Sequence, residues 1–421
     1  MIVKSFVLRR ESFPEIVRLC GEGTIAVVRP EKKFQTLFKE LIHSTIVLKK
    51  KADTSALKEY LDALPTAPGF APRKEEFLEY VLDYLRLAKT VHVSLADVEA
   101  YILSECACLC AEAVAVGCKG EVVDGRELVV CRQDGAAHVF DWAASRGEIS
   151  RILEGRDGVV VAGGYARLEE GTVVGVGKGG ANLMASLIAS ALNASHIEFY
   201  VEGDGIEGIS EMTYDEAAHY CASKKAPFTS ASLWPAKNAG IPIIVHSISN
   251  PSFGGTRISS QSAAGHLVSG CITDAGLDLV TVYGTGLLGN VGVSSSIFSS
   301  LARAGVNIRF ISQTSSEYSI SFAVASQDSA KVSEVLGKLA SDNPLLSLDD
   351  VMIVNNKVGI ITIFGSRMKN IPGISGKVFS LLGDAGINVI ASAQGGEELS
   401  ISIVIDAADI EKAAALMEDL K

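Results

Sequence analysis

The sequence predicts a large α/β domain followed by two smaller, ferredoxin-like α+β domains. The first observation is an internal repeat: Val280–Gly284 returns as Ile361–Gly365, and the match continues to Ile320 without a gap. The second is the order strand, glycine-rich loop, helix and strand over residues 158–201, which is that of a βαβ unit. The predicted domains span residues 1–260, 264–342 and 343–421.

Composition narrows the class of protein. A chain of 421 residues with 48% hydrophobic and 21% charged residues is long enough for two or three globular domains. The net charge of −11 argues against nucleic acid or an anionic membrane as the main partner. No apolar run approaches the roughly 20 residues of a membrane helix, and Met1–Arg10 lacks a signal-peptide pattern. We therefore expect a cytoplasmic protein.

The cysteines and histidines predict no metal site built from protein ligands alone. None of the eight cysteines forms a CxxC pair, and no two histidines stand four residues apart. Cys106, Cys108 and Cys110 alternate, which would scatter them over different faces of a helix. Binding of a soft metal at this trio is one interpretation, and packing of small buried thiols is the other.

The N-terminal part is predicted to combine short strands with long helices. Ile2–Leu8 and Gly23–Val28 have strand patterns, residues 31–87 are mostly helical in pattern, and 94–116 is a helical stretch. Strands are expected over 120–130, and a helix over 134–153. The run Lys49-Lys50-Lys51 either guides an anionic ligand or is a solvated helix end.

A glycine-rich loop at Gly175–Asn182 precedes a predicted helix. A loop without Cβ atoms lets backbone N–H groups approach a phosphate, and Lys178 would add positive charge. One interpretation is a dinucleotide site with Glu198 or Glu202 as its acidic residue. The loop does not match the P-loop motif, because Gly179 rather than Ser or Thr follows the lysine. A tight turn in an α/β core is the third interpretation.

Each copy of the repeat is predicted to be a β-α-β-β-α unit whose last strand is not assigned. In the first copy the strand, loop, helix, two strands and helix lie at Leu279–Tyr283, Gly284–Gly292, Val293–Ala304, Asn307–Ile311, Tyr318–Ala325 and Ala330–Leu339. The unit resembles an ACT domain, an amino-acid-sensing module. In such modules a free amino acid sits where the first loop meets the next helix, whose N-terminus supplies N–H groups.

The segments between the loop and the repeats resemble the aspartate kinase family. They are Asp204-Gly205, Met212–Ala218, Pro235–Ile243 and Gly255–Ile258. The resemblance covers residue 94 to the end of the chain. It implies an amino-acid-kinase-like three-layer sandwich followed by two ACT domains, which form a homodimer across subunits. It also implies ATP with Mg²⁺, L-aspartate as substrate, and lysine or threonine as effector.

The family's motifs fall on named positions of this chain. The catalytic positions are Lys4, Lys178, Asn182 and Asp204. The nucleotide-binding positions are Gly177, Gly179, Gly180, Glu202 and Gly205. The effector-binding positions are Asp274, Gly289, Val291, Asn307, Gln313, Thr314, Ser315 and Glu317.

Several catalytic positions depart from the family pattern. No glycine follows Lys4, Lys178 replaces an arginine, and Asn182 replaces an aspartate. The S-x-G-E segment falls out of register near Ser104–Ala107, and the A-D-P-R and H-P-R stretches are missing. Phosphoryl transfer depends on cations and on carboxylates that orient the metal, so each loss removes transition-state stabilisation.

Two functions remain open from the sequence. In the first, the chain is an aspartate kinase that transfers the ATP γ-phosphate to L-aspartate in lysine, threonine and methionine biosynthesis, under ACT control. In the second, it is a catalytically inactive, kinase-like protein that senses an amino acid and regulates a partner. Asn307 and Gln313 either bind the effector or cap a loop. The second copy keeps both residues but continues with Gly395-Gly396, which predicts an effector at the first copy.

Overall fold

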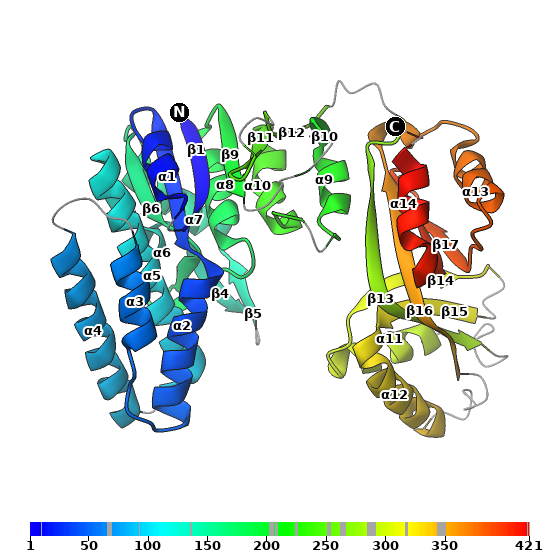
Figure 1. The fold of residues 1–421 in the computed structure, drawn as a ribbon, viewed down its shortest axis with the longest axis horizontal. Helices are drawn as coiled ribbons and strands as arrows, with labels where there is room; N and C mark the ends of the chain where they lie inside the picture. Colours follow the sequence, from blue (N-terminus) through cyan, green and yellow to red (C-terminus); the bar gives the residue numbers. More distant parts are fainter. Residues whose placement is uncertain are drawn as a thin grey trace. The chain divides into compact units, whose positions relative to one another are not determined.

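The computed structural model divides the chain into two units (Figure 1). The first contains Met1–Cys221 and Ala226–Ala263, and the second contains Ala222–Lys225 and Ala264–Lys421. The structure describes all residues except 10, 65–69, 92, 135–136, 202–205, 207–208, 224–225, 251–253, 262–266, 284–291, 316–318, 343–350, 419 and 421.

Unit 1 is built on an eight-stranded sheet with the strand order β10-β12-β11-β9-β1-β2-β6-β3. The central strands are parallel, and β11 and β12 pair antiparallel. Parallel strands covered on both faces are uniformly apolar, as the fully buried Val159–Ala162 of β6 illustrates. The other strands are β1 Ile2–Leu8, β2 Thr24–Pro30, β3 Glu121–Asp124, β9 His196–Val201, β10 Glu211–Thr213, β11 Ile243–Ser247 and β12 Thr256–Ser259.

Helices cover both faces of this sheet, so the unit has three layers (Figure 1). One face buries Phe6 and Val28 in a core shared with α1 to α5. These helices are α1 Phe13–Leu19, α2 Lys32–Ile42 with its π-helical end η1 His43–Val47, α3 Ser55–Ala63, α4 Ala71–Thr90 and α5 Leu95–Cys118. On the other side, α8 Gly180–Leu192 contacts β1, β2 and β9, and it packs against α7 Trp142–Leu153 and α10 Ser230–Ala239.

Helix α5 is long and apolar enough to cross a membrane by length and composition, which the sequence pattern did not anticipate. However, 61% of its most apolar window is buried inside the unit, where it packs on β2, β3 and β6. The helix therefore serves here as a central core helix.

Most predicted elements of unit 1 are confirmed, with three corrections. The strands expected over 120–130 are interrupted by the short helix α6 Gly125–Leu128. The predicted helix at 134–153 is wrong in its first part, because β4 Val130–Asp134 and β5 Ala137–Phe140 form a hairpin there. The helix starts only after Asp141, whose side chain accepts from the Ala144 amide as an N-cap. The helix after the glycine loop starts earlier than predicted, at Gly180. A small sheet, β5-β4-β7-β8, leads into that loop through β7 Tyr165–Leu168 and β8 Val173–Gly175.

Unit 2 contains both copies of the repeat in one antiparallel sheet with the order β14-β15-β13-β16-β18-β17. The strands are β13 Gly270–Tyr283, β14 Ile308–Gln313, β15 Ser319–Ala325, β16 Val351–Phe364, β17 Ala391–Gln394 and β18 Ser400–Asp406. The two long central strands, β13 and β16, pair along their whole length. Their helices are α11 Val293–Arg303, α12 Ser329–Asp342, α13 Ile374–Asp384 and α14 Ile410–Glu418.

The pairing of β13 with β16 supplies the strand that the sequence left unassigned. Residues 351–356, just before the second copy, pair with the first copy's opening strand. Conversely, residues 270–274, just before the first copy, pair with Ile360–Phe364 of the second. Each copy is thus completed by residues that precede the other. The predicted boundary between 342 and 343 remains a prediction.

The buried carboxylate of Asp278 links the first copy of the repeat to the strand β16. It is 5% exposed and accepts from Ser326 Oγ (2.7 Å), Ser329 Oγ (2.5 Å) and the Lys357 amide (3.1 Å). Burial alone raises the pKa of Asp278, but these hydrogen bonds outweigh it and lower the pKa. Lys357, whose amide is one of the donors, lies at a bulge with φ of 74°, and Gly276 lies at a bulge of β13 with φ of 75°.

We expect Asp278→Asn to destabilise unit 2 by about 1–3 kcal/mol, because an amide cannot accept all three hydrogen bonds and buries a donor. Urea denaturation, with hydrogen exchange of the β13 amides, measures this loss. The exposed Asp384→Asn is the matched control and should leave the midpoint unchanged. Equal midpoints for the two variants would contradict this role of Asp278.

Candidate functional site

The glycine loop presents the N-terminus of α8. Gly177 and Gly179 have φ of 81° and 74°, which favour glycine. A Cβ on Gly180 would lie 2.4 Å from Val176 Cγ2 and 3.0 Å from Gly164 Cα, so the loop packs tightly on the turn after β6. Gly177 and Lys178 are exposed. Backbone N–H groups and a lysine at this helix end form a place where an anion such as a phosphate can bind.

Asn182, in the first turn of α8, is held by hydrogen bonds within the protein. Its Oδ1 accepts from Ser5 Oγ at 2.6 Å, and its Nδ2 donates to the Pro227 carbonyl at 3.3 Å. Mg²⁺ prefers carboxylate ligands, whereas this position offers an amide whose two ends are engaged. Among the described residues of the loop, the donor set therefore fits Mg²⁺ poorly.

Lys4 lies on the opposite face of β1 from Asn182. Neighbouring Ser5 contacts Asn182, and successive side chains of a strand point to opposite faces. Lys4 is 8% exposed, with its Nζ 3.2 Å from Glu198 Oε2. Strand β1 continues to Leu8, whereas ligands of such sheets bind beyond the carboxyl ends of the strands. The structure thus separates Lys4 from Asn182, and Glu202, Asp204 and Gly205 lie outside the described residues.

Glu198 is the centre of a polar cluster around Lys4. It also accepts from Tyr200 Oη at 2.9 Å and lies 3.2 Å from His196 Nε2. Burial raises the pKa of Glu198, but Lys4 and these hydrogen bonds outweigh burial and lower it. The ring of Tyr200 stacks on His246, with centroids 4.9 Å apart. The cluster fixes Lys4 as a partner of Glu198.

This packing predicts a pH dependence of stability. Burial is the main cause that lowers the pKa of His246, helped by Lys4 and His196 and opposed by Glu198. The pKa of a histidine in the unfolded chain is about 6.5. Below that pH the unfolded chain therefore binds more protons than the folded chain, and the free energy of unfolding falls. We expect the wild type to lose more stability between pH 7 and 5 than His246→Gln does. Urea midpoints at both pH values test this, with exposed His43→Gln as control, and equal pH slopes for wild type and His246→Gln would contradict it.

A second site lies in unit 2, where Asp274 and Asn307 line one cavity of about 210 Å³. Both were predicted as effector residues. Arg309 lines the same cavity, and its Nε lies 3.8 Å from Asp274 Oδ2. The cavity is formed by β13, β14 and β16, with Thr273 and Thr362 among its polar lining residues. It combines a carboxylate, a guanidinium, an amide and hydroxyls in a volume below the roughly 300–1,000 Å³ of drug-sized sites.

The structure does not bring all the predicted effector residues together. Asn307 precedes β14, whereas Gln313 ends it, about 20 Å away at roughly 3.3 Å per residue. Gln313, Thr314 and Ser315 are exposed at that far end. The remaining predicted effector positions, Gly289, Val291 and Glu317, lie outside the described residues.

The second copy lacks the charges of this cavity. The residues 81 positions after Asp274, Asn307 and Arg309 are Asn355, Asn388 and Ile390. The strand framework is nevertheless repeated. The hydroxyls of Thr281 and Ser321 lie 2.8 Å apart in the first copy, and those of Thr362 and Ser402 also lie 2.8 Å apart in the second. The copies therefore share their framework and differ in the charged pair.

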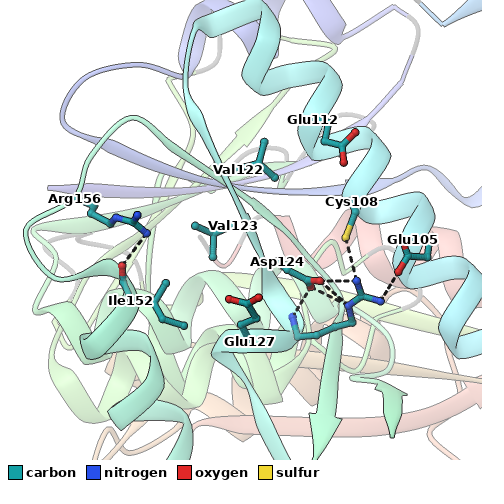
Figure 2. Close-up of a pocket in the computed structure, with 10 residues that line it drawn as sticks. Glu105, Cys108, Glu112, Val122, Val123, Asp124, Glu127, Ile152 and Arg156 are labelled. Atoms are coloured by element: carbon teal, nitrogen blue, oxygen red, sulfur yellow. Dashed lines mark hydrogen bonds and ion pairs between the residues drawn. The ribbon is translucent and has the colours of Figure 1, made fainter. Parts of the chain in front are cut away.

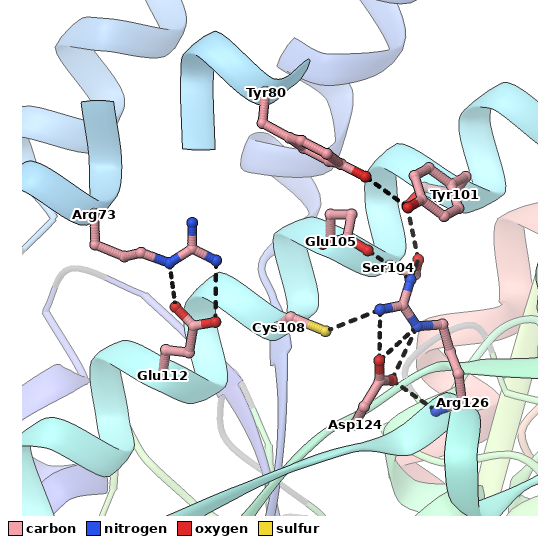
Figure 3. Close-up of polar contacts among 9 residues, drawn as sticks. All are labelled: Arg73, Tyr80, Tyr101, Ser104, Glu105, Cys108, Glu112, Asp124 and Arg126. Atoms are coloured by element: carbon pink, nitrogen blue, oxygen red, sulfur yellow. Dashed lines mark hydrogen bonds and ion pairs between the residues drawn. The ribbon is translucent and has the colours of Figure 1, made fainter. Parts of the chain in front are cut away.

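A third polar region surrounds a pocket of about 420 Å³ at the end of β3 (Figure 2). Arg126, in α6 Gly125–Leu128, bonds Asp124 through Nε (2.8 Å) and Glu105 through Nη1 (2.7 Å). Its Nη1 also donates to Ser104 Oγ at 2.9 Å, and its Nη2 lies 3.7 Å from Cys108 Sγ. Figure 3 shows the guanidinium between β3 and α5. Since its donors are used inside the protein, Arg126 ties these two elements together.

The sequence alone did not reveal the contacts that Glu198, Arg126 and Arg309 make. Glu198 was considered only as a ligand of a dinucleotide, because its pairing with Lys4 needs the register of β1 and β9. A sequence signal could have pointed to Arg309. It lies two residues after Asn307 and next to the buried Phe310, and Asp274 and Asn307 belong to the same predicted effector set. The contact of Ser104 and Glu105 with Arg126 follows only from the packing of α5 beside β3.

Comparison with known proteins agrees with this architecture. A model of the amino acid kinase family matches residues 48–247, and a model of the ACT domain matches residues 280–338 and 361–419. The structure of Escherichia coli aspartokinase III in complex with lysine and aspartate superposes with a TM-score of 0.81 at 18% identity, covering 100% of this chain and 99% of that one. The predicted fold class is confirmed.

Two curated relatives show the range of similarity. The bifunctional aspartokinase/homoserine dehydrogenase of Haemophilus influenzae is 32% identical over 264 residues, which are 59% of this chain. The chain spans about a third of that relative's length, 32% being aligned. Aspartokinase 3 of Bacillus subtilis is 25% identical over 312 residues, covering 70% of this chain and 67% of the relative.

Proposed function

Because this chain belongs to the aspartokinase family, with an amino acid kinase domain and two ACT domains, we propose that it senses a free amino acid. The proposed site is the cavity that Asp274, Asn307 and Arg309 line, where β13 and β14 meet β16 of the second copy. In this proposal the chain is a cytoplasmic homodimer of aspartate-derived amino-acid biosynthesis, assembled through its ACT domains.

The charged pair is the observation that carries this proposal. A free amino acid presents an ammonium and a carboxylate on one carbon. Asp274 and Arg309 offer the complementary charges 3.8 Å apart, so an entering ligand can replace their mutual contact with one hydrogen-bonded ion pair at each end. The Asn307 side chain and the hydroxyls of Thr273 and Thr362 supply further polar contacts.

The effector is proposed to be lysine or threonine. The similar Escherichia coli aspartokinase III was solved in complex with lysine, which supports lysine for this chain. A thermal-shift series with each of the twenty amino acids tests the identity, because a ligand bound only by the folded state raises the melting temperature. We expect a rise with lysine or threonine. A series with no rise at millimolar concentrations would contradict the proposal.

Phosphoryl transfer from ATP to L-aspartate is the second candidate function. The glycine loop favours it, because the exposed Gly177 and Lys178 lie at the start of α8, where an anion such as phosphate can bind. The engagement of Asn182 with Ser5 and Pro227, and of Lys4 with Glu198, favours sensing without turnover. We therefore propose sensing as the main role.

An assay of ADP formation with Mg²⁺–ATP and L-aspartate separates the two functions. We expect no turnover above the background without enzyme. The variant Asn182→Asp restores the family's carboxylate, and its response shows whether this one position limits catalysis. Aspartate-dependent ADP formation by the wild type would establish the second function instead.

A further inference from the structure

Two segments distant in sequence meet at one end of the helical layer of unit 1 (Figure 1). Both segments expose apolar side chains. One follows α2 and the other ends α4. The exposed side chains are Val47 (46%), Leu48 (51%), Leu87 (60%), Val91 (52%) and Val93 (38%). Single exposed apolar residues are normal, whereas a group of them marks an interaction surface. We call these five residues the α2–α4 tip.

The backbone that presents the α2–α4 tip is hydrogen-bonded. Lys89 Nζ donates to the Lys50 carbonyl at 3.3 Å and so joins the two segments. The Leu48 amide donates to the His43 carbonyl at 3.1 Å, which closes the π-helical turn. On α4, the Val91 amide donates to the Leu87 carbonyl at 3.1 Å. The side chains are therefore exposed from ordered turns.

The charge around the tip is opposite in sign to that of the chain. Four exposed lysines, Lys49, Lys50, Lys51 and Lys89, stand beside it, although the chain carries a net charge of −11. Two of the nearby carboxylates are engaged locally: Asp53 accepts from Ser55, and Asp83 bonds Arg86 at 2.6 Å. The exposed Asp97, four residues after Val93, leaves the four lysines in excess. An apolar centre with a cationic border is complementary to a segment with apolar and acidic faces.

We propose that the α2–α4 tip is the docking site for an acidic amphipathic segment of a partner protein. The apolar face of that segment covers Leu48, Leu87 and Val91, and its carboxylates face the lysines. Charge pairs at the border steer association and make it sensitive to salt. This inference is independent of the effector cavity and of catalysis, since it uses none of their residues.

Fluorescence anisotropy with the full chain tests the proposal. The probe is a labelled helical peptide of about 18 residues with leucines on one face and glutamates on the other, five turns by the helical repeat. The control peptide carries lysines in place of the glutamates. We expect micromolar binding of the acidic peptide alone, weakened at least tenfold by Leu87→Glu and by the double change Lys49→Glu, Lys51→Glu. The variant Ile371→Glu, at an apolar side chain 48% exposed in unit 2, should bind normally.

Four outcomes would overturn the inference. Equal binding of both peptides would show unspecific adhesion, and unchanged binding by Leu87→Glu would place the peptide elsewhere. Binding to phosphatidylglycerol vesicles without binding to the acidic peptide would make the tip a lipid contact. Loss of a dimer on Leu87→Glu, measured by light scattering, would make the occupant a second copy of this chain. Circular dichroism verifies that each variant is folded.

Discussion

Replacing Arg309 by glutamine is expected to weaken binding of the effector amino acid by about 10- to 100-fold. A hydrogen bond to a charged group contributes about 1.5–3 kcal/mol, and the variant removes the cation that would face the ligand's carboxylate. Glutamine keeps a similar length and a donor, so the change tests charge more than shape. Asp274→Asn should weaken binding similarly, because it removes the partner of the ligand's ammonium.

Isothermal titration of the variants measures these losses. The matched control is Arg303→Gln on α11, whose guanidinium contacts Ser300 away from the residues that line the cavity. We expect the control to bind like the wild type. Wild-type affinity in Arg309→Gln would remove Arg309 from the site, even if the chain still binds an amino acid elsewhere.

The second large effect is on stability: Arg126→Ala is expected to destabilise unit 1 by about 3 kcal/mol. The guanidinium is 17% exposed and lies between Asp124 and Glu105, themselves 26% and 18% exposed (Figure 3). Removing it leaves two partly buried carboxylates without their cation. It also removes the contact with the Tyr101 ring, 5.8 Å from the guanidinium carbon.

Urea denaturation measures this loss against two comparison variants. Arg126→Lys keeps the charge but not the planar fork, so we expect it to recover only part of the stability. Arg18→Ala breaks an exposed pair with Glu15 and should cost below about 1 kcal/mol. If Arg126→Ala and Arg18→Ala cost the same, the network of Arg126 does not hold β3 to α5.

The sequence predicted the architecture because its signals were periodic. The 81-residue repeat located both copies, and α11 follows the predicted helix closely, from Val293 to Arg303. Local turn chemistry was harder to detect. The hairpin β4–β5 was predicted as the start of a helix. The N-cap at Asp141, which marks the true start of that helix, lies inside the predicted range.

The unassigned strand shows a limit of a different kind. Residues 270–274 complete the second copy although they precede the first. Nothing in a local pattern states which of two similar strands will be the partner, because that choice depends on long-range pairing. Motif matching likewise placed Asp274 and Asn307 in one set with Gln313, whereas the geometry of β14 puts Gln313 at its other end.

The candidate catalytic positions illustrate why motif and geometry differ. Lys4 has the residue type that the family uses, but the register of β1 with β9 directs it to Glu198. Asn182 is isosteric with aspartate, and its neighbours Ser5 and Pro227 use it as a hydrogen-bonding amide. Side-chain partners across strands are properties of the folded chain, so residue type alone did not reveal them.

The most direct measurement is isothermal titration of the wild-type chain and of Asp274→Asn with lysine and with threonine, alongside Mg²⁺–ATP. The account predicts that one amino acid binds the wild type and binds Asp274→Asn at least tenfold more weakly, as expected from loss of one charged hydrogen bond. It predicts no comparable heat with Mg²⁺–ATP. An amino acid that binds both proteins equally, or none that binds either, would contradict the assignment of this cavity as the sensing site.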